Sequence, residues 1–187
     1  MDKVLQVIDK ITNDQKVKSI INSLNDNQER SKNWLIEKSG QFLSMLIEPK
    51  IVVLAGWYGN LANKLIKFSN HKVTSIDIDE ECKTIGKKLY NNVRFKTEDI
   101  YDTDVNNYNV VICTSCEHIK DFNIIYDRIA NGSLVIFQSN NYKNIKEHVN
   151  CKDSLDEFKN SFVLNKTLYS GELKLDKFTR YMIIGIK

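Results

Sequence analysis

The sequence predicts an α/β fold in which helices cover both faces of a doubly wound, mostly parallel sheet that ends in an antiparallel hairpin. Between residues 51 and 138, short apolar runs alternate with helical patterns, which is typical of such sheets. Two strand-like segments near the C-terminus have no helix between them and are expected to form the hairpin. Residues 1–49 carry apolar residues at helical spacing.

The N-terminal segment, residues 1–49, is expected to be helical. Apolar residues recur at helical spacing over 4–11 and again over 17–24. A third helix is predicted to begin at Asp26, because Asp26 followed by Glu29 has the form of a capping box. Pro49 is expected to stop this helix, since proline cannot continue one.

The core, residues 50–187, is expected to be Rossmann-like. Parallel strands are predicted over 51–55, 72–78, 93–96, 108–113 and 133–138, with helices over 61–68, 80–90 and 122–129. The hairpin strands are predicted over 162–169 and 180–186, joined by a polar turn around 171–177. Dinucleotide-binding dehydrogenases usually finish with a further parallel unit, so this ending disfavours a nucleotide-binding oxidoreductase.

Length and composition indicate a single domain over residues 1–187. The net charge is +3 and no basic run stands out, so a nucleic-acid partner is possible but not indicated. We expect a cytoplasmic protein with no membrane partner, because no signal peptide opens the chain and no apolar run approaches about 18 residues. The oligomeric state is not indicated.

Cysteine spacing does not predict a metal site. Cys113 and Cys116 have the spacing of a metal-binding pair, but no second pair accompanies them. We therefore expect reduced thiols and no bound metal. Cys116 is interpreted as a packed thiol, with a nucleophile as the alternative.

A short glycine-containing loop, Gly56-Trp57-Tyr58-Gly59, follows the first predicted strand. Glycines allow the backbone to approach a ligand, and the next helix offers free N–H groups and a partial positive charge. The alternative is a plain turn between a strand and a helix.

Asp77 ends the second predicted strand. It follows Gly56 by 77 − 56 = 21 residues, the spacing expected for a carboxylate that binds ribose hydroxyls. Helix capping is the alternative role of Asp77, although we expect Asp79 to cap the helix that follows.

The motif order and the terminal hairpin resemble the class I S-adenosylmethionine-dependent methyltransferases over residues 51–187. A closer likeness to small phage-encoded proteins of this type is carried by the segments 57–59, 114–118 and 139–142. The resemblance implies S-adenosylmethionine as cofactor and an unknown methyl acceptor. The first loop departs from the family pattern, because only Gly56 and Gly59 are present and Leu54 or Ala55 replaces the usual acidic residue.

The resemblance also implies which residues bind the cofactor. Asp77 would bind the ribose hydroxyls, and Asp99 would accept from the adenine amino group, with Glu98 as the competing carboxylate. Ile78 and Ile100 would enclose the adenine ring. The implied cofactor site consists of Gly56, Trp57, Tyr58, Gly59, Asp77, Ile78, Asp99, Ile100 and Thr114.

Two side chains capable of proton transfer, Glu117 and His118, follow the fourth predicted strand. Side chains at the carboxyl ends of parallel strands face the binding crevice, so either residue is a candidate general base. The alternative is that both orient the helix that follows. The Asn/Asp-Pro-Pro-aromatic signature of amino-methylating DNA enzymes is absent, and so is the Pro-Cys nucleophile of cytosine C5 enzymes.

Candidate acceptor-binding residues follow the fifth predicted strand. Asn140, Asn141 and Tyr142 could orient a polar acceptor, although Asn is also a natural turn residue. In the N-terminal segment, Lys32 could meet a carboxylate and Trp34 could cover the pocket or pack in the core.

The sequence thus predicts a methyltransferase, whose direct displacement chemistry needs alignment of donor and acceptor. A protein that binds S-adenosylmethionine or S-adenosylhomocysteine without catalysis is the alternative, which the reduced first loop permits.

Overall fold

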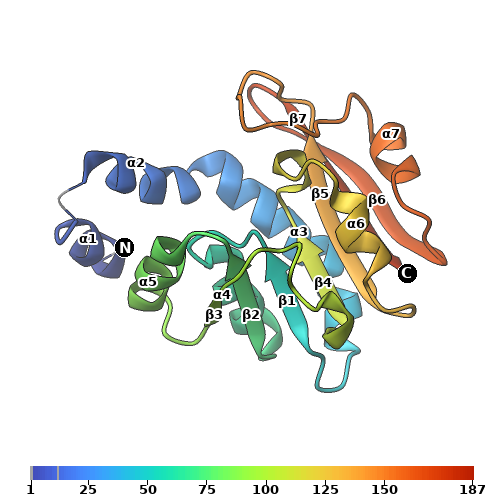
Figure 1. The fold of residues 1–187 in the computed structure, drawn as a ribbon, viewed down its shortest axis with the longest axis horizontal. Helices are drawn as coiled ribbons and strands as arrows, with labels where there is room; N and C mark the ends of the chain where they lie inside the picture. Colours follow the sequence, from blue (N-terminus) through green and yellow to red (C-terminus); the bar gives the residue numbers. More distant parts are fainter. Residues whose placement is uncertain (1, 12) are drawn as a thin grey trace.

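The computed structural model describes residues 2–11 and 13–187, which form a seven-stranded sheet with helices on both faces (Figure 1). The strand order is β3-β2-β1-β4-β5-β7-β6. Strands β1 to β5 run parallel, and β7 pairs antiparallel with β5 and β6, as predicted. The strands are β1 (Ile51–Leu54), β2 (Val73–Asp77), β3 (Arg94–Thr97), β4 (Val110–Cys113), β5 (Leu134–Asn140), β6 (Lys166–Lys174) and β7 (Thr179–Ile186).

The helices precede and alternate with the strands. They are α1 (Asp2–Ile8), α2 (Asp14–Ser23), α3 (Asp26–Ser44), α4 (Asn60–Ser69), α5 (Glu80–Leu89), α6 (Phe122–Asp127) and α7 (Leu155–Asn160), with 3₁₀ turns η1 (Val105–Asn107) and η2 (Cys116–His118). Within residues 2–11 and 13–187, every helix is too short or too polar to cross a lipid bilayer.

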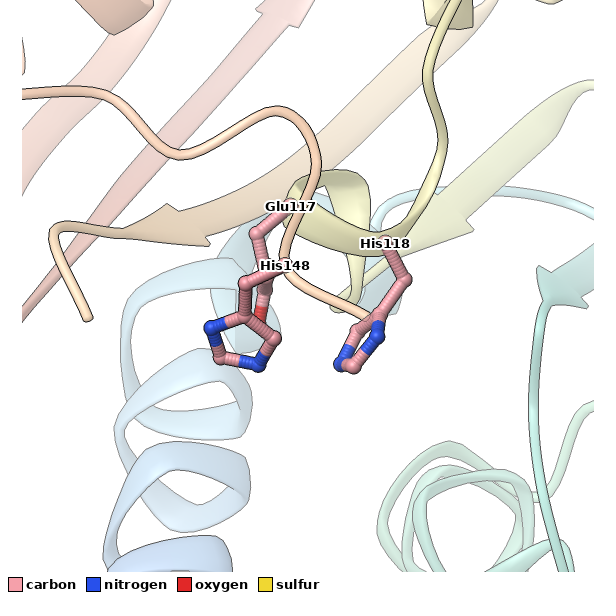
Figure 2. Close-up of side chains that lie close together, drawn as sticks. All are labelled: Glu117, His118 and His148. Atoms are coloured by element: carbon pink, nitrogen blue, oxygen red, sulfur yellow. The ribbon is translucent and has the colours of Figure 1, made fainter. Parts of the chain in front are cut away.

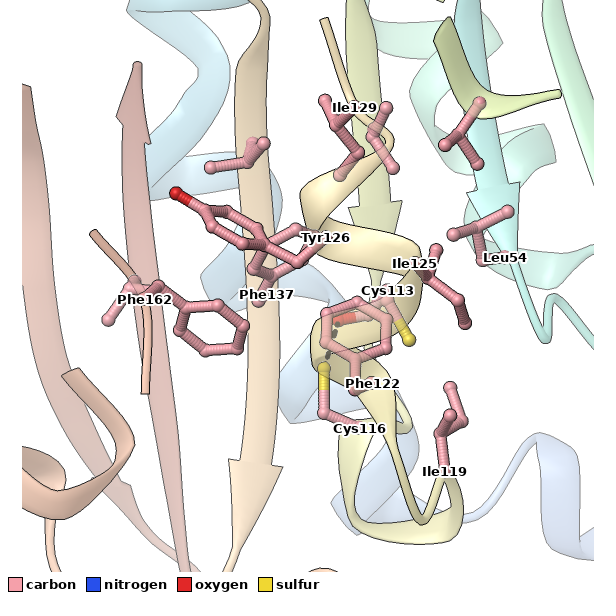
Figure 3. Packing of buried hydrophobic residues seen from close by; sticks show 14 of the residues in the cluster. Leu54, Cys113, Cys116, Ile119, Phe122, Ile125, Tyr126, Ile129, Phe137 and Phe162 are labelled. Carbon is pink, nitrogen blue, oxygen red and sulfur yellow. Dashed lines mark hydrogen bonds between the residues drawn. The ribbon is translucent and has the colours of Figure 1, made fainter. Parts of the chain in front are cut away.

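Two apolar clusters, one on each face, hold the sheet. β1, β4 and β5 are buried along their whole length because helices cover both faces. β1 and β4 are accordingly continuous apolar runs, and β5 is apolar from Leu134 to Phe137. On one face, Leu35 of α3 and Leu65 of α4 pack with Val53 of β1. On the other face, Phe122 of α6 meets Phe137 of β5 with ring centroids 4.9 Å apart (Figure 3).

A third cluster attaches the N-terminal helices to α5. Val7 of α1 and Ile20 of α2 pack with Ile85 and Leu89. This contact holds α2 and the start of α3 near the carboxyl ends of the strands, where residues 23–32 help to line a cavity.

α3 begins at Asp26 as predicted, but its N-cap and its C-terminal end differ from the prediction. The N-cap is Asn25, whose side chain accepts from the Gln28 N–H, so the predicted capping box at Asp26 is wrong. The helix ends at Ser44, several residues before Pro49, so the prediction that it continues to Pro49 is wrong.

The C-terminal third also differs in detail. β5 continues to Asn140, because β7 pairs with it through the Asn140–Arg180 register. Gly171 was expected in a turn but pairs with Met182 inside β6, where a Cβ would lie 2.3 Å from the Tyr169 hydroxyl. The helix α7 was not predicted from the sequence.

Candidate active site

A cavity of about 520 Å³ lies at the carboxyl edge of the parallel strands, as the motif positions predicted. A second cavity of about 240 Å³ adjoins it, and the two share Ala55, Asp77 and His118. A larger hollow of about 670 Å³ lies at the opposite edge of the sheet, around Lys50 and Arg94. Of the candidate site residues, Glu98 alone, the competing carboxylate, lines that hollow.

The loop after β1 makes a tight turn against β2. Ala55 and Trp57 have left-handed backbone, with φ of 48° and 51°, a conformation that costs about 1–3 kcal/mol for a residue with a side chain. A Cβ on Gly56 would lie 2.2 Å from the Ser75 hydroxyl oxygen, so close packing on β2 requires glycine there. Trp57 and Tyr58 line the larger cavity.

Gly59 has a packing role in addition to its predicted place in the cofactor site. It caps α4 with φ of 80° and no side-chain hydrogen bond. A Cβ at Gly59 would lie 2.5 Å from the Phe95 ring, and one at Gly86 of α5 would lie 2.5 Å from the same ring. The two helices therefore dock on β3 through glycine contacts with one phenyl group.

Asp77 lies between the two cavities and organises the loop. One carboxylate oxygen accepts from the Trp57 N–H at 2.8 Å, and the other accepts from the Asp79 N–H at 3.1 Å. Burial raises the pKa of Asp77, although both N–H donors act against the rise. Asp79 accepts from the Glu81 N–H at 2.9 Å, so the prediction that Asp79 caps α5 is confirmed.

The smaller cavity has mostly apolar walls. Ile78 and Ile100 line it, as does Asp99, whose carboxylate accepts from the Tyr101 N–H at 2.9 Å. Glu98, the competing carboxylate, does not line this cavity. The structure therefore favours Asp99 over Glu98.

Glu117 is held in a buried polar cluster. Its Oε1 accepts from the Asn140 side-chain amide at 2.6 Å and lies 3.6 Å from the Arg180 guanidinium. Arg180 also donates to the Thr114 carbonyl at 2.8 Å. The Glu117 and Arg180 side chains are only 3% and 5% exposed. Oε2 of Glu117 has no hydrogen-bond partner among the described residues.

His118 lies at the mouth of the cavity, where partial burial lowers its pKa. Its ring faces that of His148, with centroids 4.5 Å apart and planes nearly perpendicular. Together with Glu117, these rings place possible ligand atoms within 4.8 Å of one another (Figure 2). This cluster was not predicted from the sequence, from which no metal site was expected.

Two of the three predicted acceptor-binding residues line the larger cavity, and the third does not. Asn140 and Tyr142 line the larger cavity, and Tyr142 stacks on Phe178 with ring centroids 5.4 Å apart. Asn141 does not line the cavity; its side-chain oxygen accepts from the Thr179 N–H at 2.8 Å. The structure therefore gives Asn141 a role in joining β5 to β7 instead.

Of the two candidates in the N-terminal segment, Lys32 lines the larger cavity and Trp34 does not. Lys32 is buried, lines the larger cavity and donates to the Ser23 carbonyl at 2.7 Å. Burial lowers the pKa of Lys32 to about 8. Trp34 packs in the core edge-to-face with Tyr169 and does not line the cavity, so the core interpretation of Trp34 is confirmed.

The cysteine pair is packed in the core. Cys113 and Cys116 are buried free thiols in the apolar cluster around α6 (Figure 3). Burial raises the pKa of Cys116 well above its ordinary value. The interpretation of Cys116 as a packed thiol is therefore confirmed.

Sequence reasoning assigned no role to Arg180 or His148. Arg180 is the second residue of β7, a mostly apolar strand, and a charge at such a position is a signal of a buried partner. His148 lies in an irregular loop, where spacing carries no information about which element it will contact.

No protein-family model matches this sequence, and no curated protein is significantly similar to it. Solved structures are similar in fold. The N-methyltransferase NodS from Bradyrhizobium japonicum WM9, in complex with S-adenosyl-L-homocysteine, has a TM-score of 0.67 at 10% identity, with 100% of both chains covered. An RNA methyltransferase from Salinibacter ruber, in complex with S-adenosyl-L-homocysteine, has a TM-score of 0.54 at 14% identity, covering 83% of this chain and 90% of that one.

A third similar structure is a protein from Galdieria sulphuraria, described as a proposed sarcosine dimethylglycine methyltransferase. It has a TM-score of 0.53 at 13% identity over 60% of this chain and 46% of its own. The match therefore spans less than half of that protein. At these identities the comparisons establish the fold alone, which is the Rossmann-like fold of class I methyltransferases.

Proposed function

We propose that this chain is an S-adenosylmethionine-dependent methyltransferase whose acceptor is unknown. The observation that carries the proposal is the cavity at the carboxyl edge of the sheet, lined by the loop after β1, by Asp77 and by η2. In doubly wound sheets this edge is where ligands bind, and structures of this fold include methyltransferases in complex with S-adenosylhomocysteine.

The residues present fit this cofactor. The two N–H donors to Asp77 do not fully offset the burial of its charge, because burial still raises its pKa. The carboxylate has further lone pairs that can accept from ribose hydroxyls. Ile78 and Ile100 offer apolar walls for a purine beside Asp99. The adjoining cavities of about 520 and 240 Å³ suit a ligand of this size, since ligand sites span about 300–1,000 Å³.

Lys32 suits the amino-acid end of the cofactor. Lys32 lines the larger cavity, and burial lowers its pKa to about 8 although the nearby Glu29 carboxylate acts in the opposite direction, so the ammonium group is only partly compensated. A carboxylate there would form a charge-assisted hydrogen bond with Lys32. When bound, S-adenosylmethionine supplies a methyl group activated by its sulfonium, and the chain's own task is alignment.

Acceptor binding is assigned to the side of the cavity that Asn140, Tyr142 and His118 line. The prediction that Glu117 or His118 accepts a proton rests on their position in this cavity. A general base contributes about 10²–10⁴-fold in rate. The closer likeness to phage-encoded proteins and the cytoplasmic location remain predictions.

Calorimetry with S-adenosylmethionine and S-adenosylhomocysteine tests the cofactor, and transfer of a tritiated methyl group to fractionated cell extract tests the reaction. We expect binding of both compounds and label incorporation in at least one fraction. Absence of binding at millimolar concentration would remove the proposal. Binding without transfer to any fraction would favour a non-catalytic binding protein.

A further inference from the structure

Three side chains with metal-binding atoms converge on the acceptor side of the cavity. Glu117 and His118 belong to η2, and His148 belongs to the loop after β5. Figure 2 shows the two imidazole rings facing each other beside the carboxylate of Glu117. The ligand atoms of all three lie within 4.8 Å of one another.

One residue fastens this loop to η2. The Asn150 N–H donates to the Glu117 carbonyl at 2.9 Å. Its side-chain amide donates to the carbonyls of Cys116 at 3.3 Å and Ile119 at 3.0 Å. Asn150 thus bonds both ends of η2, at Cys116 and at Ile119. His148, two residues before Asn150, is therefore held beside η2.

The orientation of His148 is that of a metal ligand. Its Nδ1 is hydrogen-bonded to the Tyr142 carbonyl. A carbonyl oxygen can only accept, so Nδ1 carries the proton and Nε2 keeps its lone pair. Metal-binding histidines characteristically donate their other ring N–H to a carbonyl or carboxylate in this way.

Glu117 supplies an unused acceptor. Asn140 and Arg180 occupy the surroundings of Oε1, whereas Oε2 is buried without a partner among the described residues. A buried acceptor without a donor costs about 1–3 kcal/mol, and more for a charged group. A cation between Oε2 and the two imidazoles would remove this cost.

We propose that Glu117, His118 and His148 bind a divalent transition-metal ion. Two imidazoles and one carboxylate suit zinc, cobalt, iron or manganese, whereas magnesium and calcium prefer oxygen ligands. Ligand atoms about 2.1 Å from a tetrahedral ion lie about 3.4 Å apart, so ligand atoms now up to 4.8 Å apart approach one another by up to about 1.4 Å on binding. The guanidinium of Arg180 opposes a second positive charge, and we expect affinity in the micromolar range.

Three protein ligands leave at least one coordination position open. This position lies in the cavity, because all three residues line it. Only one part of the inference rests on the proposed function, namely that the open position receives an oxygen or nitrogen atom of the methyl acceptor. The metal site itself stands on the three side chains. A lone pair that coordinates the ion cannot also accept a proton, so with the metal bound neither Glu117 nor His118 is the general base, and the two roles are alternatives.

The test uses the full chain, first freed of metal with a chelator and then titrated with Co²⁺. We expect one Co²⁺ per chain, a visible absorption band from a site of low coordination number, and displacement by Zn²⁺. His118→Ala and His148→Ala should each weaken Co²⁺ binding at least tenfold. His71→Ala is the matched control, because His71 is the remaining histidine of the three in the chain and lies at the opposite edge of the sheet. The His71→Ala protein should bind Co²⁺ as the wild type does.

Unchanged Co²⁺ binding in both His118→Ala and His148→Ala would overturn the metal site, and so would the absence of any binding by the wild type. If Glu117→Gln fails to fold, the two histidine variants decide the question. Calorimetry with S-adenosylmethionine on the same preparations separates the two proposals. Cofactor binding without Co²⁺ binding refutes only the metal site, and the reverse result refutes only the proposed function.

Discussion

Lys32→Met should stabilise the protein while weakening its binding of S-adenosylmethionine. The ammonium group is buried, and its pKa falls from 10.5 to about 8, chiefly through desolvation. At about 1.4 kcal/mol for each tenfold change, this fall corresponds to about 3 kcal/mol against the charged form. Loss of the hydrogen bond to the Ser23 carbonyl should destabilise the variant by about 1 kcal/mol. We expect a net gain of about 2 kcal/mol at pH 7.

The gain should depend on pH in a defined direction. Below pH 8 both folded and unfolded chains hold the Lys32 proton, and the folded state carries the full penalty. Between about pH 8 and 10.5 the unfolded chain holds more protons, so the wild type gains stability as pH rises. The difference between wild type and Lys32→Met should therefore shrink over this range.

Urea unfolding followed by circular dichroism at pH 7 and pH 10 measures both effects. In a thermal melt at pH 7, a gain of 2 kcal/mol should raise the melting temperature by about 4–8 °C in a chain of this size. Lys18→Met, at an exposed position of α2, is the control and should change little. A less stable Lys32→Met protein at pH 7, or a difference that stays constant to pH 10, would refute the reasoning. Calorimetry should show weaker cofactor binding by Lys32→Met.

Three other substitutions test the site and its supports. Asp77→Ala should weaken S-adenosylmethionine binding about ten- to a hundredfold in calorimetry, whereas Asp79→Ala should lower stability in urea by about 1 kcal/mol through the lost helix cap. Weaker cofactor binding by Asp79→Ala than by Asp77→Ala would show that the wrong carboxylate was chosen. Gly59→Ala should cost about 1–3 kcal/mol more than Gly132→Ala, because both have positive φ but only Gly59 faces a ring; equal melting temperatures would contradict this. Arg180→Met should destabilise by about 3–5 kcal/mol in urea, since it leaves a buried carboxylate unpaired, and wild-type stability would show that the ion pair is dispensable.

The parallel sheet was predictable because a strand that is buried on both faces is a short continuous apolar run in the sequence. β1 is buried throughout, and its residues Ile51–Leu54 lie inside the predicted range 51–55. The same order of strands brings Asp77, Glu117 and His118 to one edge, since the carboxyl ends of parallel strands meet there. Local pattern and topology together therefore located the cavity.

Contacts between segments distant in sequence were not predictable in this way. The partner of Glu117 is Arg180, on a strand 180 − 117 = 63 residues later, and no periodicity links two such positions. The helix α7 did have a local signal that the prediction missed. Ser154 followed by Glu157 has the sequence form of a capping box. In the structure, Ser154 accepts from the Glu157 N–H, and Glu157 accepts from the N–H of Asp153, one residue before the cap.

The position of Arg180 on β7 has a consequence for synthesis of the chain. Glu117 emerges from the ribosome 63 residues before the guanidinium that neutralises it, and the outer edge of β5 stays without a partner until β7 arrives. An apolar strand with an open edge is a site of mispairing. The cavity wall formed by Glu117 and Asn140 is therefore completed late, and a nascent chain that stops short of β7 would present an aggregation-prone edge in place of a binding site.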